Sequence, residues 1–207
     1  MSLPHSATFT IGEYLALERA SEERHEFLDG QIYAMASGTI QHGDMCTNLV
    51  AELGSQLKGT PCRVLSKDMR VRSGPAPRSR LSSKGLFSYP DVIVICDEPQ
   101  FHDEYQDVVI NPTVIIEVLS PSTEAFDRGE KWSRYQTWLP SLTDYILVSQ
   151  SEPQLEHFRR QPNGKWLYSP VRGLDGCLVL DTIGCILRLE EVYDRVVFPV
   201  ESPEKAD

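Results

Sequence analysis

The pattern of apolar and polar positions is most distinctive in two runs of strand length, residues 89–95 and 112–120. Both are rich in β-branched and aliphatic residues, and each contains a single carboxylate, Asp91 in the first and Glu117 in the second. A buried strand normally excludes an unpaired charge, because removing it from water costs several kcal/mol. The two acids therefore predict either partly exposed strand ends or, where the strands pair, two carboxylates that converge on a site suited to magnesium.

Helical and strand periods alternate along the rest of the chain. Thr10 and Glu13 have the spacing of a capping box and predict a first helix. The following elements are then expected: a hairpin over 24–36, a helix over 40–57, a strand over 62–72, a loop over 73–88, a helix from 124 to Pro140, a strand over 142–150, short strands over 154–189 and a short helix over 190–193. This order indicates an α+β fold with a mixed central sheet flanked by helices.

The length of 207 residues suits one domain with a sizeable core. We expect residues 10–198 to form it, with tails at 1–9 and 199–207. No apolar run approaches the roughly 18 residues that span a bilayer, and no signal peptide is evident, so we expect a cytoplasmic protein without a membrane partner. The five cysteines show no CxxC spacing, which predicts reduced thiols and no zinc site.

The net charge of −10 argues against a non-specific nucleic-acid coat, which is usually basic. It does not exclude an enzyme on nucleic acid, whose metal site must be acidic. One segment, residues 67–84, is locally basic, with one acid, Asp68, against six cations: Lys67, Arg70, Arg72, Arg78, Arg80 and Lys84. This segment predicts either a solvated loop or a surface that faces phosphates.

Several short motifs follow one another in a defined order. They are Arg24-His25-Glu26-Phe27-Leu28-Asp29-Gly30, Pro90-Asp91, Glu117-Val118-Leu119-Ser120-Pro121-Ser122-Thr123, Asp127-Arg128-Gly129-Glu130-Lys131, Tyr135, and Pro140-Ser141-Leu142 with Tyr145. In this order they resemble the Uma-type restriction endonucleases of bacteria, which belong to the PD-(D/E)XK nuclease superfamily. The resemblance runs from about residue 10 to residue 197.

The resemblance implies a restriction-endonuclease-like fold and Mg²⁺-dependent cleavage of DNA, with Mn²⁺ as an alternative ion. Asp91 and Glu117 match the metal-binding acids, and Glu26 matches a further acidic position that supports the metal or its bound water. Leu119 stands where the superfamily usually has its lysine, and Lys131 is the substitute if its helix folds back over the acids. Taken singly, Glu26 is as readily a solvent-facing hairpin residue as a site residue, and Lys131 alone is more readily a solvated helix lysine.

Other residues of these motifs are open to two interpretations. His42 falls where the family often has histidine, and it is either a structural or a catalytic residue. Tyr135 lies one helical turn after Lys131 and is expected to be a core aromatic. The hydroxyls of the 120–123 segment (Ser120, Ser122 and Thr123) are expected to cap the helix that follows.

We therefore expect a Mg²⁺-dependent endodeoxyribonuclease with Glu26, Asp91, Glu117 and Lys131 in its active site. Its phosphate contacts are predicted to come from five basic residues: Arg70, Arg72, Arg78, Arg80 and Lys84. A nuclease-fold protein that binds nucleic acid or a protein without cutting is the first alternative, and a metal-dependent hydrolase of another substrate is the second. The target sequence, the choice between DNA and RNA, the biological role and the oligomeric state, including a homodimer, are left open.

Overall fold

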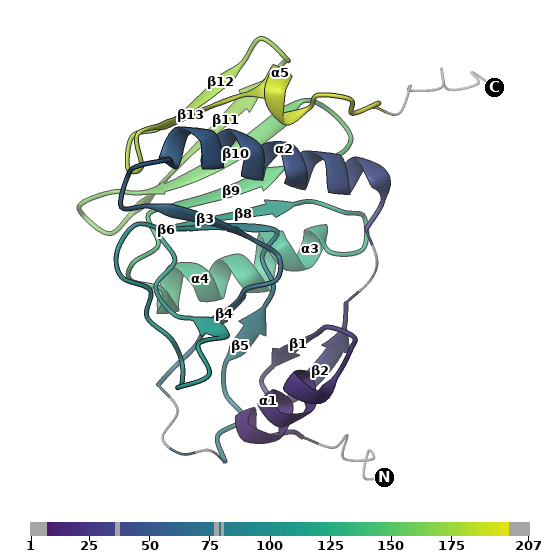
Figure 1. Ribbon diagram of the computed structural model, residues 1–207, viewed down its shortest axis with the longest axis vertical. Coiled ribbons are helices and arrows are strands. Elements are labelled where there is room, and N and C mark those ends of the chain that lie inside the picture. Colours follow the sequence, from purple (N-terminus) through teal and green to yellow (C-terminus); the bar gives the residue numbers. More distant parts are fainter. Residues whose placement is uncertain (1–7, 36–37, 77–78, 80, 199–207) are drawn as a thin grey trace, which may run out of the picture.

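The largest unit of the protein is a six-stranded mixed sheet, called sheet B below (Figure 1). The structure is a computed structural model that describes residues 8–35, 38–76, 79 and 81–198. In spatial order, sheet B consists of β11 (Trp166–Arg172), β10 (Gln154–Arg160), β9 (Asp144–Val148), β8 (Val114–Val118), β6 (Val92–Ile95) and β3 (Arg63–Ser66). Only β8 and β9 pair in parallel, and the other neighbours in this sheet are antiparallel.

Two smaller sheets lie beside sheet B. Sheet A has the order β2 (Gln31–Ala34), β1 (His25–Leu28), β5 (Leu86–Ser88), β4 (Arg70–Ser73) and β7 (Val108–Val109). A two-stranded sheet is formed by β12 (Cys177–Leu180) and β13 (Cys185–Arg188). The α+β architecture with a mixed sheet, predicted from the order of elements, is confirmed.

Helices cover both faces of sheet B (Figure 1). The helical segments of the protein are α1 (Ile11–Ala20), α2 (Ile40–Leu57), α3 (Glu124–Phe126), the π-helical turn η1 (Asp127–Lys131), α4 (Trp132–Trp138) and α5 (Leu189–Val192). Helix α1 packs on β1, β5 and β7 of sheet A rather than on sheet B. Helix α2 lies on one face of the sheet, and α3 to α4 lie on the other face, between sheet B and strands β4 and β5. No helix in the described part of the chain has both the length and the apolar character needed to cross a membrane.

The strict alternation of side chains along β8 builds two separate cores. Val114 and Ile116 pack with the buried row of α2, whereas Ile115 packs with Tyr135 and Leu139 on the opposite face. Because both faces of the strand are covered, its sequence is apolar at nearly every position. Glu117 follows in the same alternation and therefore faces the side of α4.

Several predicted elements are confirmed at their expected places. The side chain of Thr10 accepts a hydrogen bond from the backbone of Glu13, and the Glu13 carboxylate accepts one from the Thr10 backbone, which completes the capping box. Helix α2 has the predicted bounds, and its four-residue apolar row is buried. The hairpin turns at Asp29 and Gly30, both with positive φ.

Two predictions about the segment from residue 62 to residue 88 are wrong. The single strand expected over 62–72 is two strands, β3 and β4, which belong to different sheets and are separated by a turn at 67–69. The turn is closed by a hydrogen bond from the Met69 backbone N–H to the Ser66 carbonyl. The loop expected over 73–88 also ends in a strand, β5, which pairs between β1 and β4.

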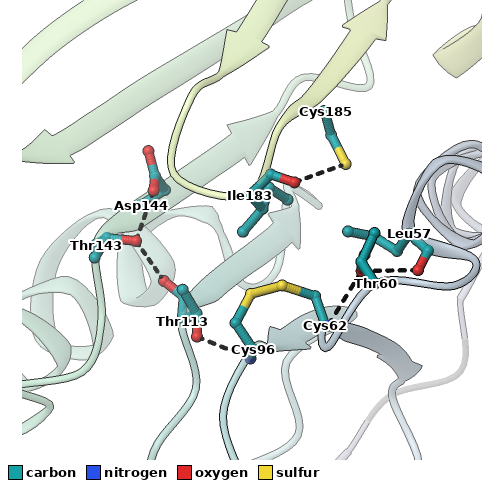
Figure 2. The surroundings of a disulfide bond; sticks show 9 residues. All are labelled: Leu57, Thr60, Cys62, Cys96, Thr113, Thr143, Asp144, Ile183 and Cys185. Atoms are coloured by element: carbon teal, nitrogen blue, oxygen red, sulfur yellow. Dashed lines mark hydrogen bonds between the residues drawn. A yellow bond between two sulfur atoms is a disulfide. The ribbon is translucent and has the colours of Figure 1, made fainter.

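The expectation of reduced thiols is wrong for two of the five cysteines. Cys62 and Cys96 form a disulfide at the edge of sheet B (Figure 2). The β3–β6 register pairs Arg63 with Ile95, so the next pair outward is Cys62 and Cys96. They are 34 residues apart in the sequence, and only the antiparallel pairing brings them together.

Candidate active site

An open cavity of about 630 Å³ lies where β6 begins and β8 ends. Its walls come from the β1–β2 hairpin, the start of α2, the two central strands, the 120–123 segment and η1. All four residues predicted to be catalytic line it, together with one further acid and a histidine: Glu26, Asp91, Glu117, Lys131, Asp127 and His42. The tertiary structure thus gathers the motif residues at one place.

Asp91 and Glu117 occupy opposite positions on neighbouring strands. The antiparallel register pairs Val92 of β6 with Ile116 of β8, and the next pair outward is Asp91 and Glu117. The Asp91 carboxylate is held by the backbone: its Oδ2 accepts a hydrogen bond of 2.8 Å from the Val118 N–H. Pro90 ends the ladder just before Asp91, which leaves this carboxylate at the open end of the strand.

Lys131 lies over the acids. Its buried Nζ is 3.0 Å from Asp127 Oδ1, 3.3 Å from Glu26 Oε1 and 3.3 Å from Glu117 Oε1. The helical segment after residue 123 packs against sheet B, and η1, which follows α3, brings Asp127 and Lys131 into the cavity at the ends of β6 and β8. π-Helical turns are rare overall, and those that occur are often found at functional sites. Lys131 thus lies beside Glu117, and Leu119 is buried among the apolar side chains on the same side of the sheet.

Tyr135 is a core aromatic, as its position predicts, but it also belongs to the site. Its hydroxyl donates a hydrogen bond of 3.2 Å to Glu117 Oε1 and lies 2.8 Å from Ser88 Oγ. The neighbouring Tyr145 hydroxyl donates to the backbone carbonyl of Asp127 at 2.9 Å. Two buried phenols therefore hold the Glu117 carboxylate and the turn η1 in place.

Burial dominates the electrostatics of the Glu117 side. It raises the pKa of Glu117 well above the ordinary value, and Asp127, Asp91 and Glu26 add to this, while Lys131 opposes it. For Lys131 burial lowers the pKa, but the carboxylates of Glu117 and Glu26 outweigh it, and the pKa is well above its usual value. Lys131 therefore stays protonated at neutral pH and can stabilise negative charge rather than accept a proton.

Asp127 is a site residue to which the sequence analysis assigned no role. It is buried, and its Oδ1 has no hydrogen-bond partner among the described residues, although it lies within ion-pair distance of Lys131. Two sequence signals pointed to it: Asp127 opens the motif that ends at Lys131, and it stands four residues before that lysine, the spacing of neighbours on one side of a helix. The buried carboxylates of Asp127 and Glu117, with Glu26 and Asp91 in the same cavity, are the oxygen donors that a hard divalent cation prefers, so these residues fit Mg²⁺.

His42, left open by the sequence, contacts Asp91. Its Nε2 is 2.9 Å from Asp91 Oδ1, and its Nδ1 is 3.3 Å from the side-chain amide of Gln150. One helical turn later, Cys46 offers its sulfur to the same region, and the ligand atoms of His42, Cys46 and Asp91 all lie within 4.8 Å of one another. Sequence spacing concealed this group, because its members come from α2 and from the start of β6.

Two of the five residues predicted to contact phosphates are not accessible in the structure. Arg70 and Arg72 are buried, with Arg70 paired to Asp107 and Arg72 hydrogen-bonded to the Pro75 carbonyl. Neither guanidinium is free to meet a phosphate, and the reason is that β4 forms part of the interior of sheet A. Arg78 and Arg80 lie outside the described residues. Lys84 is exposed, with its Nζ 3.7 Å from Asp29.

The expected capping role of the 120–123 hydroxyls is wrong. The following helix begins after Thr123, whose side chain makes no capping hydrogen bond. Instead, Ser120 Oγ lies 3.1 Å from Ser122 Oγ and 2.9 Å from Thr123 Oγ1, and the three residues line the cavity. Exposed Lys67 lines the same cavity and adds a cation at its mouth.

Comparison with known proteins places this arrangement in a family. Residues 11–189 match the Uma2 family, described as "Putative restriction endonuclease". Two uncharacterized proteins of Synechocystis, slr1290 and sll1609, are 33% and 32% identical; they cover 90% and 79% of this chain and 92% and 88% of their own lengths. The crystal structure of a "putative nuclease belonging to DUF820" from Anabaena variabilis has the same fold, with a TM-score of 0.71 at 17% identity over 91% of this chain and 99% of its own. The family predicted from the motifs is thus confirmed, and the chain belongs to the Uma2 family.

Proposed function

We propose that this protein is a divalent-metal-dependent endonuclease that hydrolyses phosphodiester bonds of DNA. The observation that carries the proposal is the convergence of four carboxylates, Glu26, Asp91, Glu117 and Asp127, with the protonated Lys131 in one open cavity. We assign the activity to a single domain, residues 10–198. Mg²⁺ is the proposed ion, with Mn²⁺ as its substitute, because the donors are predominantly carboxylate oxygens.

The roles of the residues follow from their surroundings. Asp91 and Glu117 would hold the ion, which when bound supplies a Lewis acid and lowers the pKa of a bound water. Lys131 stabilises the negative charge that develops on the phosphate, since the acids around it keep it protonated. Glu26 accepts a hydrogen bond of 3.2 Å from the Tyr89 backbone, which fixes it beside Lys131 and orients the lysine toward the cavity.

A second candidate is a nuclease-fold protein that binds nucleic acid or a protein partner without cutting. The observation that favours it is the burial of Arg70 and Arg72, which removes two of the predicted phosphate contacts from a chain of net charge −10. The two candidates differ in whether the cavity performs chemistry. A cleavage assay therefore separates them directly.

The test is incubation of purified protein with supercoiled plasmid in Mg²⁺, in Mn²⁺ and in EDTA. We expect nicked or linear DNA with either ion, none in EDTA, and no cleavage by Asp91→Asn or Glu117→Gln. The matched control is Asp181→Asn, an exposed acid paired with Arg159 on the surface, which should cleave normally. The proposal would be contradicted if the wild-type protein did not cleave DNA with either ion, or if Asp91→Asn and Glu117→Gln cleaved DNA as well as the wild type.

A further inference from the structure

We infer that His42, Cys46 and Asp91 form a binding site for a thiophilic divalent ion such as Zn²⁺ or Co²⁺. The site stands on these three side chains alone, and only its consequence for cleavage rests on the proposed function. It adds a sulfur and a nitrogen ligand to a cavity whose other donors are oxygens. The missing CxxC spacing predicted no zinc site, but the ligands here come together in space rather than in sequence.

The geometry brings three ligand atoms to one point. His42 and Cys46 lie four residues apart on α2 and therefore share one side of the helix. Their ligand atoms and an oxygen of Asp91 lie within 4.8 Å of one another, and His42 Nε2 is 2.9 Å from Asp91 Oδ1. In a tetrahedral zinc site with metal–ligand bonds of about 2.0–2.3 Å, ligand atoms are roughly 3.4–3.7 Å apart. Ion binding would therefore widen the His42–Asp91 separation by about 0.5 Å and bring any more distant ligand atom to within about 3.7 Å of the others.

The surroundings hold the ligands in the orientation that an ion needs. Asp91 Oδ2 is fixed by the Val118 N–H, which directs Oδ1 toward His42. The Gln150 amide nitrogen lies 3.3 Å from His42 Nδ1, so in this arrangement Nδ1 accepts and Nε2 carries the proton toward Asp91. A turn of the Gln150 amide presents its oxygen to an Nδ1–H instead and frees Nε2 for the ion. Such outer contacts set the ring orientation of metal-binding histidines. His42 and Asp91 line the cavity, which supplies a path for the ion and water for a fourth position.

The donor set selects the class of ion. Thiolate and imidazole favour zinc, cobalt and related borderline ions, whereas magnesium prefers oxygen ligands and keeps its waters. On binding, the Cys46 thiol releases its proton to solvent and its sulfur forms the bond to the ion. A carboxylate, an imidazole and a thiolate carry a net charge of −2, which matches a divalent ion.

Asp91 belongs to both this site and the proposed magnesium site. An ion bound by His42 and Cys46 withdraws Asp91 from Mg²⁺, so the thiophilic ion acts as an inhibitor of Mg²⁺-dependent cleavage. The inhibition should be competitive, since one carboxylate cannot serve two ions in two geometries. Metal identity would thus control the activity through a residue, Cys46, that lies outside the lining of the cavity.

The direct test is Co²⁺ substitution of the purified full-length protein, followed by absorption spectroscopy. A cobalt–thiolate bond produces a charge-transfer band in the near ultraviolet, and we expect this band to saturate at one equivalent. In Cys46→Ser the band should disappear, and calorimetry should show Zn²⁺ binding at least ~100-fold weaker, because one of three protein ligands is lost. His42→Asn should weaken Zn²⁺ binding similarly. The matched control is Cys177→Ser, which removes an exposed free thiol on β12 and should keep both signals.

The outcomes distinguish this inference from the proposed function. A wild-type protein without the charge-transfer band, or a Cys46→Ser variant that binds Zn²⁺ as tightly as the wild type, would overturn the site. Absence of the band in the wild-type protein is informative without any variant, so the test does not depend on whether Cys46→Ser folds. A charge-transfer band in a wild-type protein that does not cleave DNA would support the thiophilic metal site and contradict the proposed endonuclease function. Cleavage with Mg²⁺ that Zn²⁺ leaves unaffected contradicts the inhibitory consequence.

Discussion

The two sides of the cavity hold carboxylates in contrasting environments. On one side, Glu117 faces a buried ammonium group, Lys131, and a buried phenol, Tyr135. On the other side, Asp91 faces the His42 imidazole, and in the described part of the chain no lysine or arginine forms an ion pair with it. The protein thus carries its own cation beside Glu117, and on the Asp91 side the proposed metal ion would take that place.

This difference separates the groups that stabilise the arrangement of the site, around Lys131, from the group proposed to bind the metal ion, Asp91. Lys131 offsets the repulsion among the neighbouring carboxylates of Glu26, Glu117 and Asp127, the last two of which are buried. Asp91 is instead held by the Val118 N–H and by the His42 imidazole. An incoming cation could displace the imidazole from the carboxylate or bind to both groups. The predictions below test this division, beginning with the largest expected effect.

Removing the internal cation should have the largest effect. Lys131→Met should lower single-turnover plasmid cleavage by roughly 100- to 1,000-fold, the scale of one positioned electrostatic group. Mg²⁺ affinity, measured by calorimetry, should not fall, because a competing positive charge has been removed. The control is Arg134→Met on the same helix, since Arg134 pairs with Glu130 and Asp29 outside the cavity. Normal cleavage by Lys131→Met would refute the assigned role.

The protein contains a second aspartate–histidine pair that sharpens the comparison. His157 Nε2 lies 2.7 Å from Asp144 Oδ1, and both residues are buried between β9 and β10. His157→Asn should lower the free energy of unfolding by about 2–3 kcal/mol, because it leaves a buried carboxylate short of a partner. His42→Asn should cost less than about 1 kcal/mol, since water in the cavity can replace the ring. Urea unfolding of both variants measures this, and equal losses would make the His42–Asp91 pair structural.

Glu117 should destabilise the metal-free fold at neutral pH. Its pKa is raised by burial in the folded state, so the unfolded chain loses this proton at lower pH than the folded one. The stability that comes from the protonated form is therefore lost as pH rises above the ordinary value of 4.5. Glu117→Gln cannot ionise, and at pH 8 it should be more stable than the wild type by about 1 kcal/mol, or about 2–4 °C in Tm. At pH 4 this gain should vanish; a gain of the same size at both pH values would contradict the argument.

The smallest effect is expected at two exposed lysines, Lys67 in the lining of the cavity and Lys84 outside it. Lys67 and Lys84 are the exposed cations of the basic segment among the described residues, and each proposed phosphate contact should contribute about 0.9 to the slope of log affinity against log salt. Lys67→Ala and Lys84→Ala, each assayed on a duplex in EDTA to prevent cleavage, should each reduce the slope by that amount. Lys165→Ala, on the turn between β10 and β11, is the control. An unchanged slope would assign the lysine to solvent.

Local patterns predicted much of the fold because they reflect contacts between residues close in sequence. The capping box at Thr10, the hairpin turn at Gly30 and the apolar row of α2 are of this kind. The division of residues 62–72 between two sheets was not predicted, because polar and apolar residues are mixed throughout this segment and the polar residues of the turn do not stand out. The burial of Arg70 likewise depends on Asp107, which lies 37 residues away.

For the site, the sequence by itself determined which acids stand in strands and which lysine follows them, because motif order is a property of the chain. Glu26, Asp91, Glu117 and Lys131 could be named on that basis. Only the tertiary structure decided that Asp127 joins them, that Arg70 is withdrawn from the surface, and that Cys46 lies beside Asp91. These outcomes depend on strand register and helix packing, which bring together residues tens of positions apart, and no local pattern encodes such distances.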